Sequence, residues 1–352
     1  MPNVLLVAGR MRPSGTAVYT LNLVRGLIAT GQRVLLLHGG GDFAASSEDG
    51  VAAEEVEGLG ARFYNIFAHL ARLRRIASEK WDVLHVTSDL IVRKGAAMAR
   101  RLRLPAVVTF HHLVERPVTL PSAVRRVIAV SEAIRESLVN HARLAKDRIR
   151  VIPSGVDIET AEERCGDAGG HTPVVGVVGR LTAEKGVDYF LRAAAVVAER
   201  GPECHFLVAG GGADERKLRA LARELGIEER VTFLVRFRSQ FEVLSAVDVL
   251  VLPSLREGYG QIVLEAMACG RATVSTAVGA VPDFLEDGVT GLLVPQRDPE
   301  AMAAAIEKLL RDEDLRRRIG RAGKALVRER FGLNSMVTQT VQLYDEVLGE
   351  AG

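Results

Sequence analysis

One strand-to-helix turn in the second half of the chain carries two cations close together. The turn runs from Gly179 and Arg180 to Lys185 and Gly186, after an apolar run that ends at Val178. The first N–H groups of a helix can bind an anion, and a neighbouring arginine and lysine add positive charge. The turn therefore predicts a diphosphate site, with a solvated surface turn as the alternative.

Two glutamates bracket the next informative segment, Glu257-Gly-Tyr-Gly-Gln-Ile-Val-Leu-Glu265. Eight helical residues span about 12 Å, which is too far for a paired-carboxylate acid/base couple, so the two glutamates must have separate roles. Glu257 lies in a loop beside two glycines and is expected to accept hydrogen bonds from sugar hydroxyls. Glu265 lies in an otherwise apolar helix, so its carboxylate needs a partner, either a ribose diol or a salt bridge.

Alternating apolar and amphipathic runs must position these residues. Short Val/Leu/Ile runs, from Asn3–Ala8 to Ile149–Ile152 and again from Val174–Val178 to Asp248–Leu252, predict strands buried on both faces of parallel sheets. Helical runs lie between them. The predicted fold class is therefore α/β, with two Rossmann-like doubly wound domains that bind ligands at the carboxyl ends of their strands. Two such domains facing each other would place a site in a deep cleft between them.

Composition places the chain among ordinary globular proteins. Its 352 residues are 48% hydrophobic and 26% charged, which excludes a disordered or collagen-like chain and suggests two domains. No apolar run reaches the roughly 18 residues that span a bilayer, and the first residues do not resemble a signal peptide. The cysteines Cys165, Cys204 and Cys269 are odd in number and far apart, which argues against a disulfide framework and for the reducing cytoplasm.

The motifs together resemble the retaining glycosyltransferases of family four (glycosyl transferases group 1), which have the GT-B fold. The strongest part is Gly179-Arg180 with Glu184-Lys185-Gly186, followed by two glutamates eight positions apart in EGYGQIVLEAMACG. The ordered set covers the whole chain and is specific, whereas each piece alone is weak. The other matching segments are Pro13-Ser-Gly-Thr-Ala, Ile152-Pro-Ser-Gly-Val-Asp157, Ala209-Gly-Gly-Gly212 and Thr290-Gly-Leu-Leu-Val-Pro295.

The resemblance implies roles for the matching residues. Arg180 and Lys185 would bind the donor diphosphate and stabilise the leaving nucleotide. Glu257 would hold hydroxyls of the transferred sugar, and Glu265 would bind the ribose. His111, in the segment Thr-Phe-His, matches a histidine near the sugar and the reacting centre. The implied catalytic residues are His111, Arg180, Lys185 and Glu257, and the implied donor-binding residues are Gly15, Gly179, Arg180, Lys185, Gly210, Glu257, Gly258, Tyr259, Gly260, Gln261 and Glu265.

Several polar residues at predicted strand ends keep two interpretations. His111 lies where ligands are expected, with a structural histidine as the alternative. His112 is the less favoured partner because it falls at a variable position of the family. His85 ends another strand and could line the acceptor side. Ser131 either contacts the donor or caps the helix that follows it.

Departures from the family pattern leave the base and the sugar of the donor open, but none of them removes a charged group. Ser14, Val235 and Ala280 stand where glycine is common, Ser154 replaces an asparagine, and Gln261 replaces an apolar residue. No strand ends in Asp-x-Asp, and Asp312-Glu-Asp314 is expected in a surface helix. Because Arg180 and Lys185 would supply the positive charge, no metal is expected.

The sequence thus predicts a glycosyltransferase that moves a sugar from a UDP-, GDP- or ADP-sugar to an unidentified acceptor, with retention and without a cofactor. The alternatives are a nucleotide-sugar epimerase or a phosphorylase on the same fold, and a non-catalytic partner of an active transferase. The predicted N-terminal, acceptor-side domain covers residues 1–158, and the predicted donor domain covers residues 173–333. The charged stretch 159–172 is the predicted linker and hinge. The last helix, about residues 334–352, is expected to pack on the N-terminal domain, as the resemblance implies.

The first half of the chain is basic. Residues 60–150 carry 18 Lys/Arg and 7 Asp/Glu, a net charge of +11. An apolar stripe of Phe67, Leu70, Leu73 and Ile76 lies beside some of these cations. Such a surface is compatible with peripheral binding to an anionic membrane at the cytoplasmic face, and so with a lipid-linked acceptor. The alternatives are a soluble acidic acceptor, and an apolar stripe that is ordinary core beside solvated arginines.

Overall fold

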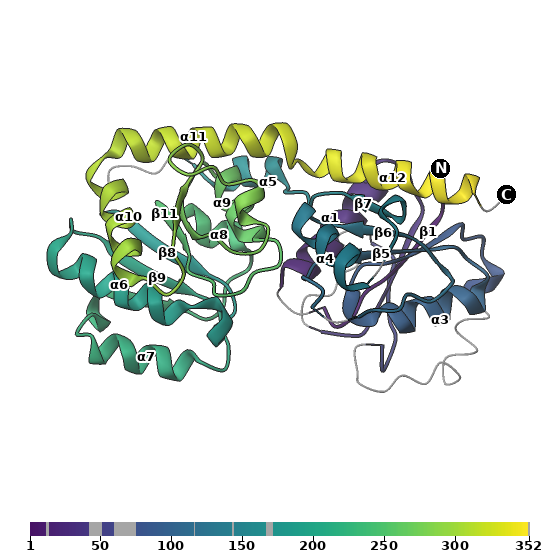
Figure 1. The fold of residues 1–352 in the computed structure, drawn as a ribbon, viewed down its shortest axis with the longest axis horizontal. Coiled ribbons are helices and arrows are strands. Elements are labelled where there is room, and N and C mark those ends of the chain that lie inside the picture. The colour runs from purple at the N-terminus through teal and green to yellow at the C-terminus, as the bar shows by residue number, and fades with distance from the viewer. Residues whose placement is uncertain are drawn as a thin grey trace. The chain divides into compact units, whose positions relative to one another are not determined.

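The computed structural model describes residues 1–11, 14–41, 51–59, 75–115, 117–142, 144–166 and 172–350. The chain divides into two compact units, each built around one parallel sheet (Figure 1). Unit 1 comprises Met1–Gly155 and Leu333–Gly352, and unit 2 comprises Val156–Gly332. The chain therefore passes between the units twice, after Gly155 and after Gly332.

The described part of unit 1 contains one sheet of parallel strands in the order β3-β2-β1-β4-β5-β6-β7. Every residue of β1, β2, β4 and β5 is buried, which explains their largely apolar sequence. The strand order reverses between β1 and β4, so the loops after these strands lie at the edge where open sheets bind ligands. The strands are β1 Val4–Val7, β2 Val34–His38, β3 Ala53–Glu55, β4 Val83–Val86, β5 Ala106–Phe110, β6 Val124–Ala129 and β7 Ile149–Val151.

Helices α1 and α12 of unit 1 come from opposite ends of the chain and pack together. Gly26 of α1 allows the close approach, because an added Cβ would lie 2.2 Å from Cγ2 of Val337. The C-terminal helix therefore belongs to the N-terminal unit. The helices are α1 Gly15–Ala29, α3 Val92–Leu102, α4 Glu132–Ala142 and α12 Leu333–Gly349, with the 3₁₀ turns η3 Asp89–Ile91 and η4 Lys146–Arg148.

Unit 2 has a parallel sheet in the order β10-β9-β8-β11-β12-β13, with its own reversal between β8 and β11. Its strands are β8 Val174–Val178, β9 His205–Ala209, β10 Val231–Leu234, β11 Val249–Leu252, β12 Ala272–Thr276 and β13 Leu292–Val294. Its helices are α5 Ile158–Arg164, α6 Val187–Arg200, α7 Glu215–Glu224, α8 Gln240–Ser245, α9 Gln261–Ala268, α10 Pro299–Arg311 and α11 Glu313–Arg330, with the 3₁₀ turns η5 Ala183–Lys185, η6 Glu228–Arg230 and η7 Val281–Asp283.

The α/β class predicted from the sequence is confirmed in both units. The predicted strand Val174–Val178 has the observed bounds of β8. The acidic triplet after α10 is a helix start: Asp312 accepts a hydrogen bond from Leu315 N, and the next two acidic residues occupy the first turn of α11. Such residues stabilise the N-terminal end of a helix.

The expectation of an irregular linker over residues 159–172 is wrong in its first part. Helix α5 occupies Ile158–Arg164, and the carboxylate of Asp157 caps it by accepting from Thr160 N at 3.0 Å. Charged residues of α5 also bind α11, where Glu162 pairs with Lys324 and Arg328. The segment therefore starts as a helix packed into unit 2; residues 167–171 lie outside the described residues.

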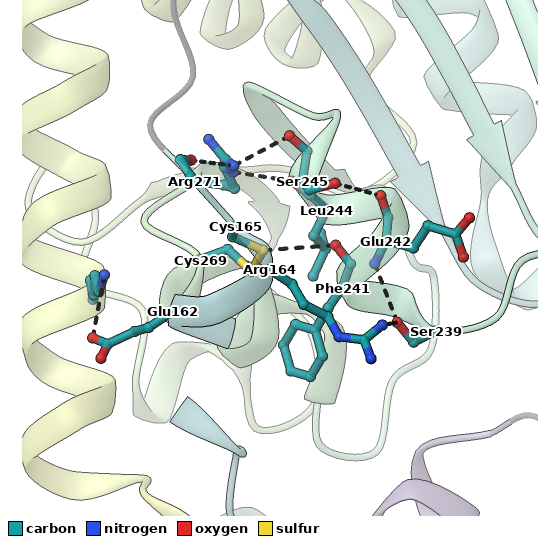
Figure 2. The surroundings of a disulfide bond; sticks show 12 residues. Glu162, Arg164, Cys165, Ser239, Phe241, Glu242, Leu244, Ser245, Cys269 and Arg271 are labelled. Carbon is teal, nitrogen blue, oxygen red and sulfur yellow. Dashed lines mark hydrogen bonds and ion pairs between the residues drawn. A yellow bond between two sulfur atoms is a disulfide. The ribbon is translucent and has the colours of Figure 1, made fainter. Parts of the chain in front are cut away.

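Cys165 and Cys269 form a disulfide across a sequence separation of 104 residues (Figure 2). The expectation against disulfides is therefore wrong, because packing of α5 on α9 brings together cysteines that are far apart in sequence. The argument for a reducing compartment loses its basis with it. Arg271 secures the same region, donating from Nη2 to Gly166 O at 2.9 Å and from Nε to Leu244 O at 3.0 Å.

Among the described residues, no helix combines the length and the apolar composition that crossing a membrane requires.

Candidate functional site

The loops after β8 and β11 meet at the strand reversal of unit 2. The loop after β8 carries Arg180 and ends in η5, whose last residue is Lys185. The loop after β11 carries Glu257 and leads into α9. The two loops are joined through the main chain, since Glu184 O accepts hydrogen bonds from Leu255 N at 2.8 Å and Arg256 N at 3.2 Å. The two motifs that the sequence singled out thus occupy one place.

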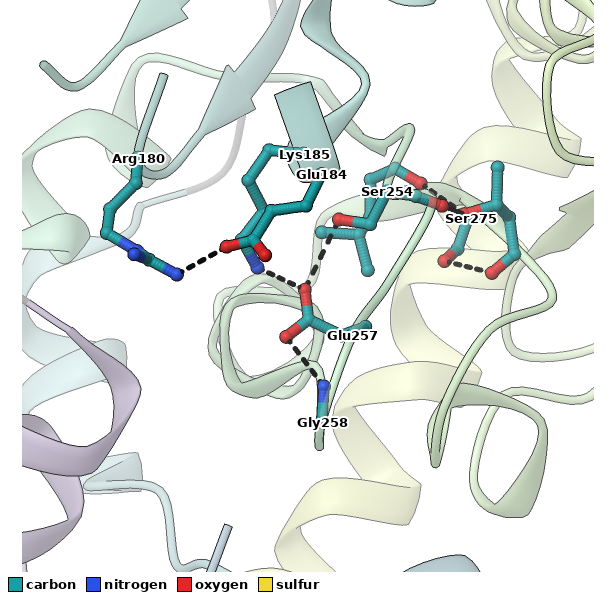
Figure 3. Close-up of polar contacts among 9 residues, drawn as sticks. Arg180, Glu184, Lys185, Ser254, Glu257, Gly258 and Ser275 are labelled. Carbon is teal, nitrogen blue, oxygen red and sulfur yellow. Dashed lines mark hydrogen bonds and ion pairs between the residues drawn. The ribbon is translucent and has the colours of Figure 1, made fainter. Parts of the chain in front are cut away.

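Lys185 and Glu257 form the central ion pair of this place, with Nζ 2.6 Å from Oε2 (Figure 3). The same oxygen lies 3.3 Å from Ser254 Oγ, and Gly258 N donates to the other carboxylate oxygen at 3.2 Å. The two charged side chains are 20% and 14% exposed, so they are shielded yet reachable. A lysine and a carboxylate held in this way offer one group for an anion and one for hydroxyls.

Arg180 lies nearby and is paired with Glu184, Nη2 to Oε1 at 2.7 Å (Figure 3). Both side chains are about half exposed, at 57% and 44%, so solvent screens the pair and it contributes less than about 1 kcal/mol. Glu184 is part of the motif quoted from the sequence, but no role in the site was assigned to it there. Its spacing of four from an arginine in a short turn is the signal that could have found it. In unit 2 both predicted phosphate-binding cations are thus paired with carboxylates.

Glycines allow the neighbouring loops to touch. A Cβ on Gly210, at the end of β9, would lie 1.8 Å from Gly179 O, and one on Gly212 would lie 2.2 Å from Leu181 O. Gly260, which precedes α9, has φ 86° and a Cβ there would lie 2.8 Å from Val281 Cγ2. The backbone around the ion pair is therefore close-packed on one side. Beside Gly179 itself a Cβ would meet nothing within 4 Å, which leaves room for a ligand.

The side chains of Tyr259 and Glu265 are both buried. The Tyr259 ring is buried and packs on Phe284, with ring centroids 5.8 Å apart. Glu265 is 3% exposed, and Gln240 Nε2 donates to its Oε1 at 3.0 Å. Burial raises the pKa of Glu265 to about 7, and hydrogen bonds from Gln240 and Gln261 oppose that rise. Of the two partners expected from the sequence, a salt bridge is not what Glu265 has, since its partners within the chain are amides.

His111 lies at the carboxyl end of β5 in unit 1. Its Nε2 is 3.0 Å from Thr87 O, which can only accept, so Nε2 carries the proton. The Tyr19 ring packs edge-on against the imidazole, with centroids 4.6 Å apart and an interplanar angle of 73°. Burial lowers the pKa of His111 to about 4. At neutral pH the ring is therefore an uncharged imidazole whose Nδ1 carries a lone pair.

Two further histidines lie near His111, and one of them, His85, differs from expectation. His85 does not line an acceptor surface: it is fully buried, with Nδ1 2.6 Å from Tyr344 Oη and Nε2 2.7 Å from Thr109 Oγ1. Burial lowers the pKa of His85 to about 3. His112 is exposed, and its Nδ1 lies 3.1 Å from both carboxylate oxygens of Asp89. The interpretation of His85 is corrected because Tyr344, far along the chain, closes over it.

The remaining unit 1 candidates are helix starts. Gly15 is the first residue of α1, and Ser14 caps that helix by accepting from Ala17 N at 3.3 Å. The loop residue Pro13 lies outside the described residues. Ser131 Oγ accepts from Ile134 N at 3.2 Å, which is the helix-capping interpretation. No group of three or more His, Cys, Asp or Glu side chains suited to a metal ion occurs among the described residues.

Two family profiles match the chain. "Glycosyltransferase Family 4" matches residues 13–160, and "Glycosyl transferases group 1" matches residues 163–326. Alpha-D-kanosaminyltransferase of Streptomyces kanamyceticus is 32% identical over 281 residues, 71% of this chain and 72% of that protein. D-inositol 3-phosphate glycosyltransferase of Xylanimonas cellulosilytica is 31% identical over 317 residues, 79% of this chain and 75% of that protein.

Solved structures share the fold at lower identity. A glycosyltransferase from Rickettsia africae has a TM-score of 0.80 at 20% identity and covers 99% of both chains. Anabaena HepE in complex with UDP-glucose has a TM-score of 0.81 at 18% identity and covers 98% of this chain and 100% of that chain. The two Rossmann-like sheets are thus those of the GT-B fold.

Proposed function

The chain belongs to the family-four glycosyltransferases, and we propose that it moves a sugar from a nucleotide-diphosphate donor to an acceptor hydroxyl with retention of the anomeric configuration. The family membership covers the transfer of a sugar. The donor class, the stereochemical outcome and the residue roles below are the proposal.

The observation that carries the donor site is the contact of Lys185 with Glu257 at the strand reversal of unit 2. A donor brings two negative phosphates and a sugar with several hydroxyls. Lys185 would exchange its carboxylate for a phosphate oxygen, which would free Glu257 to accept hydrogen bonds from the hydroxyls. Each charge-assisted contact of this kind is worth about 1.5–3 kcal/mol.

Departure of the nucleotide diphosphate is the step that these cations would assist. Negative charge grows on the phosphate oxygen as its bond to the anomeric carbon breaks, and Arg180 and Lys185 would stabilise that charge. The acceptor oxygen bonds to the same carbon from the same face, and its proton passes to the departing phosphate. We assign no protein nucleophile and no metal to this step, because two cations already flank the site.

Other unit 2 residues complete the proposed donor site. The main chain around Gly179, Gly210 and Gly258 would lie against the diphosphate and sugar. Glu265, whose Oε1 accepts from Gln240, would bind the ribose diol. On the acceptor side, His111 would accept a hydrogen bond at Nδ1 from a hydroxyl at the reacting centre, and Gly15 would let the loop before α1 approach the donor phosphate.

The first experiment pairs a binding screen with a transfer assay. UDP-, GDP- and ADP-sugars are ranked by thermal shift, since a ligand at 100 times its Kd stabilises the folded state by about 2.7 kcal/mol. The best donor is then incubated with candidate acceptors, with and without EDTA, and the anomeric configuration of the product is read by proton NMR.

The proposal expects transfer that survives EDTA and a product with the donor's configuration. Complete, reversible loss on chelation would overturn the metal-free step, and inversion would overturn the stereochemistry. Conversion of the free donor to an epimer would identify an epimerase instead. Phosphorolysis of a glycan would identify a phosphorylase, and binding without turnover would identify a non-catalytic partner.

The acceptor part of the proposal is a lipid-linked molecule at an anionic membrane surface. Helix α3 and its end expose Arg93, Arg100, Arg101 and Arg103, each worth about 1 kcal/mol near such a surface. The apolar stripe does not support the idea: Ile76 is fully buried, and the other three residues lie outside the described residues. A cytoplasmic location is also proposed, because a charged nucleotide sugar does not cross a bilayer unaided.

Liposome co-sedimentation tests this surface. Binding should require anionic lipid and should fade with salt over the range in which the Debye length shortens from about 30 to 10 Å. A variant with the exposed arginines of α3 replaced by glutamine should remain in the supernatant. Equal recovery of the wild-type protein with and without anionic vesicles at low salt would end the membrane proposal.

A further inference from the structure

Helix α1 of unit 1 carries two adjacent buried residues, Tyr19 and Thr20, one turn after its start at Gly15. Both reach the histidine side of the unit. Tyr19 packs its ring on His111, and Thr20 Oγ1 lies 2.8 Å from the hydroxyl of Thr87, the residue whose carbonyl holds His111. One rigid helix therefore supports the imidazole from two directions.

The hydrogen bond from His111 to Thr87 fixes only one atom of the ring. It sets the tautomer, with the proton on Nε2 and the lone pair on Nδ1, but the imidazole could still pivot about that contact. The edge-on Tyr19 ring stands 4.6 Å away and blocks the pivot. Two contacts of different kinds thus determine both the tautomer and the ring plane.

Tyr19 is itself held in place. Its Oη lies 3.1 Å from Thr109 Oγ1, which also lies 2.7 Å from His85 Nε2, and His85 Nδ1 lies 2.6 Å from Tyr344 Oη. All four side chains are fully buried, so solvent does not compete for these hydrogen bonds. The chain of contacts runs from the C-terminal helix α12 through β4 and β5 to the ring that touches His111.

We propose that Tyr19 is a positioning residue for His111: its ring, tied to Thr109, holds the imidazole plane so that Nδ1 meets a hydroxyl at the reacting centre. This inference rests on the proposed function, in which His111 acts at that centre. Tyr19 touches no substrate in this account. Small errors in the placement of such a group matter, since a misplacement of about 1 Å can cost about 100-fold in rate.

A double-mutant cycle separates positioning from ordinary packing. Tyr19→Leu, which removes the ring, should lower kcat by about 10- to 100-fold, while the donor KM changes less than about twofold. In the His111→Ala background the same substitution should change kcat by less than about threefold, because no imidazole remains to be positioned. A packing defect would lower activity by the same factor in both backgrounds, and that result would overturn the proposal.

Two further variants keep the test decisive if Tyr19→Leu does not fold. Tyr19→Phe keeps the ring and loses its tie to Thr109, so kcat should fall by about 3- to 10-fold in the wild-type background alone. Tyr344→Phe is the matched control, because it removes the tyrosine hydroxyl at the far end of the network. It should lower Tm and change kcat by less than about twofold. An equal loss of kcat in both variants would assign the effect to the network and overturn the role of Tyr19.

A readout without turnover distinguishes this inference from the proposed function. In nitrogen-15 NMR of histidine-labelled protein, with His111 assigned from the His111→Ala spectrum, the ring should show the Nε2-protonated tautomer. Tyr19→Leu should broaden or average these signals. If the wild-type protein gives sharp signals of this tautomer but transfers no sugar, the proposed function is contradicted and the positioning of His111 is not. If Tyr19→Leu leaves the signals unchanged, the positioning itself is contradicted.

Discussion

The candidate groups of the two units are built on opposite electrostatic principles. In unit 2 the cations Lys185 and Arg180 each hold a carboxylate, and the pairs are partly exposed. In unit 1 His111 and His85 are buried and uncharged, and burial lowers the pKa of both. The unit 2 groups lie in the loops after β8 and β11, where the strand order reverses, whereas His85 lies within β4 and His111 follows β5. Two parallel sheets thus hold charged groups in one unit and neutral ones in the other.

This difference indicates what each unit can do. Paired charges can exchange partners when an anion arrives, because the anion replaces the carboxylate that the cation leaves. A buried neutral imidazole cannot change its charge cheaply, and it acts through position and one lone pair. We therefore expect the unit 2 site to be sensitive to loss of its charged side chains and to ligand binding. We expect the unit 1 site to be sensitive to changes in side-chain position and to low pH.

The largest expected difference between the units is their response to a reductant. All three cysteines lie between residues 156 and 332, and the pair Cys165–Cys269 closes a loop of about 100 residues. Loss of such a link costs about 2–5 kcal/mol. Scanning calorimetry should therefore show dithiothreitol lowering the transition of unit 2 and leaving unit 1 unchanged.

Cysteine variants sharpen that experiment. Cys165→Ser and Cys269→Ser should unfold at the temperature of the reduced wild-type protein and should no longer respond to the reductant. Cys204→Ser, at the free buried cysteine, should keep the response. A wild-type transition that dithiothreitol does not move would contradict the disulfide.

Next in size is the loss of the unit 2 cations. Lys185→Ala and Arg180→Ala should each lower nucleotide-sugar turnover by about 10- to 100-fold, because each would remove a proposed charge-assisted contact to phosphate, worth about 1.5–3 kcal/mol. Steady-state rates at saturating and subsaturating donor measure this. The matched control is Lys324→Ala, a lysine of the same unit that pairs with Glu162. Wild-type rates in both site variants would remove these residues from the site.

The free energy of unfolding should change with pH in opposite directions in the two units. His111 and His85 have pKa values of about 4 and about 3 when folded, so below pH 6.5 the unfolded chain takes up their protons and unit 1 loses stability as pH falls. Glu265 has a pKa of about 7 when folded, so its contribution to unit 2 is full below about pH 4.5 and is lost as pH rises through 7.

Hydrogen exchange measures this opposite pH dependence when it is followed separately in peptides of each unit. The rates are corrected for the pH dependence of intrinsic exchange. Each of these groups should change the free energy of unfolding by about 1.4 kcal/mol per pH unit between its folded and unfolded pKa values. Glu265→Gln should flatten the dependence in unit 2 and leave that of unit 1 intact. Parallel changes in both units between pH 5 and pH 7.5 would break the comparison.

The smallest expected effect is a gain of affinity. In the proposed donor site Glu184 would compete with phosphate for Arg180, and Glu184→Gln keeps the main-chain carbonyl that joins the two loops. The donor KM should fall by up to about threefold with kcat unchanged, since the exposed pair is worth less than about 1 kcal/mol. Glu215→Gln, which breaks a similar pair with Arg219 elsewhere in unit 2, is the control. A higher donor KM in Glu184→Gln would show that this carboxylate assists donor binding.

Local pattern predicted most of the strands and both unit 2 loops, because buried parallel strands read as apolar runs and glycines mark the turns. It could not predict contacts between distant segments. His85 has the pattern of a ligand-facing strand end, yet Tyr344, 259 residues away, closes over it. The disulfide and the contact of Tyr19 with His111 also join segments that are distant in sequence. Glu265 illustrates a third limit, since its amide partner Gln240 carries no charge that a sequence pattern would reveal.

Hydrogen exchange in the presence of a saturating nucleotide sugar tests the central claim most directly, namely that the strand reversal of unit 2 binds the donor diphosphate. With the UDP-, GDP- or ADP-sugar that gives the largest thermal shift, protection should appear in peptides that cover residues 179–186 and 253–265, and it should be absent in Lys185→Ala. Protection confined to other segments, or none with any of the three donor classes, would contradict the account.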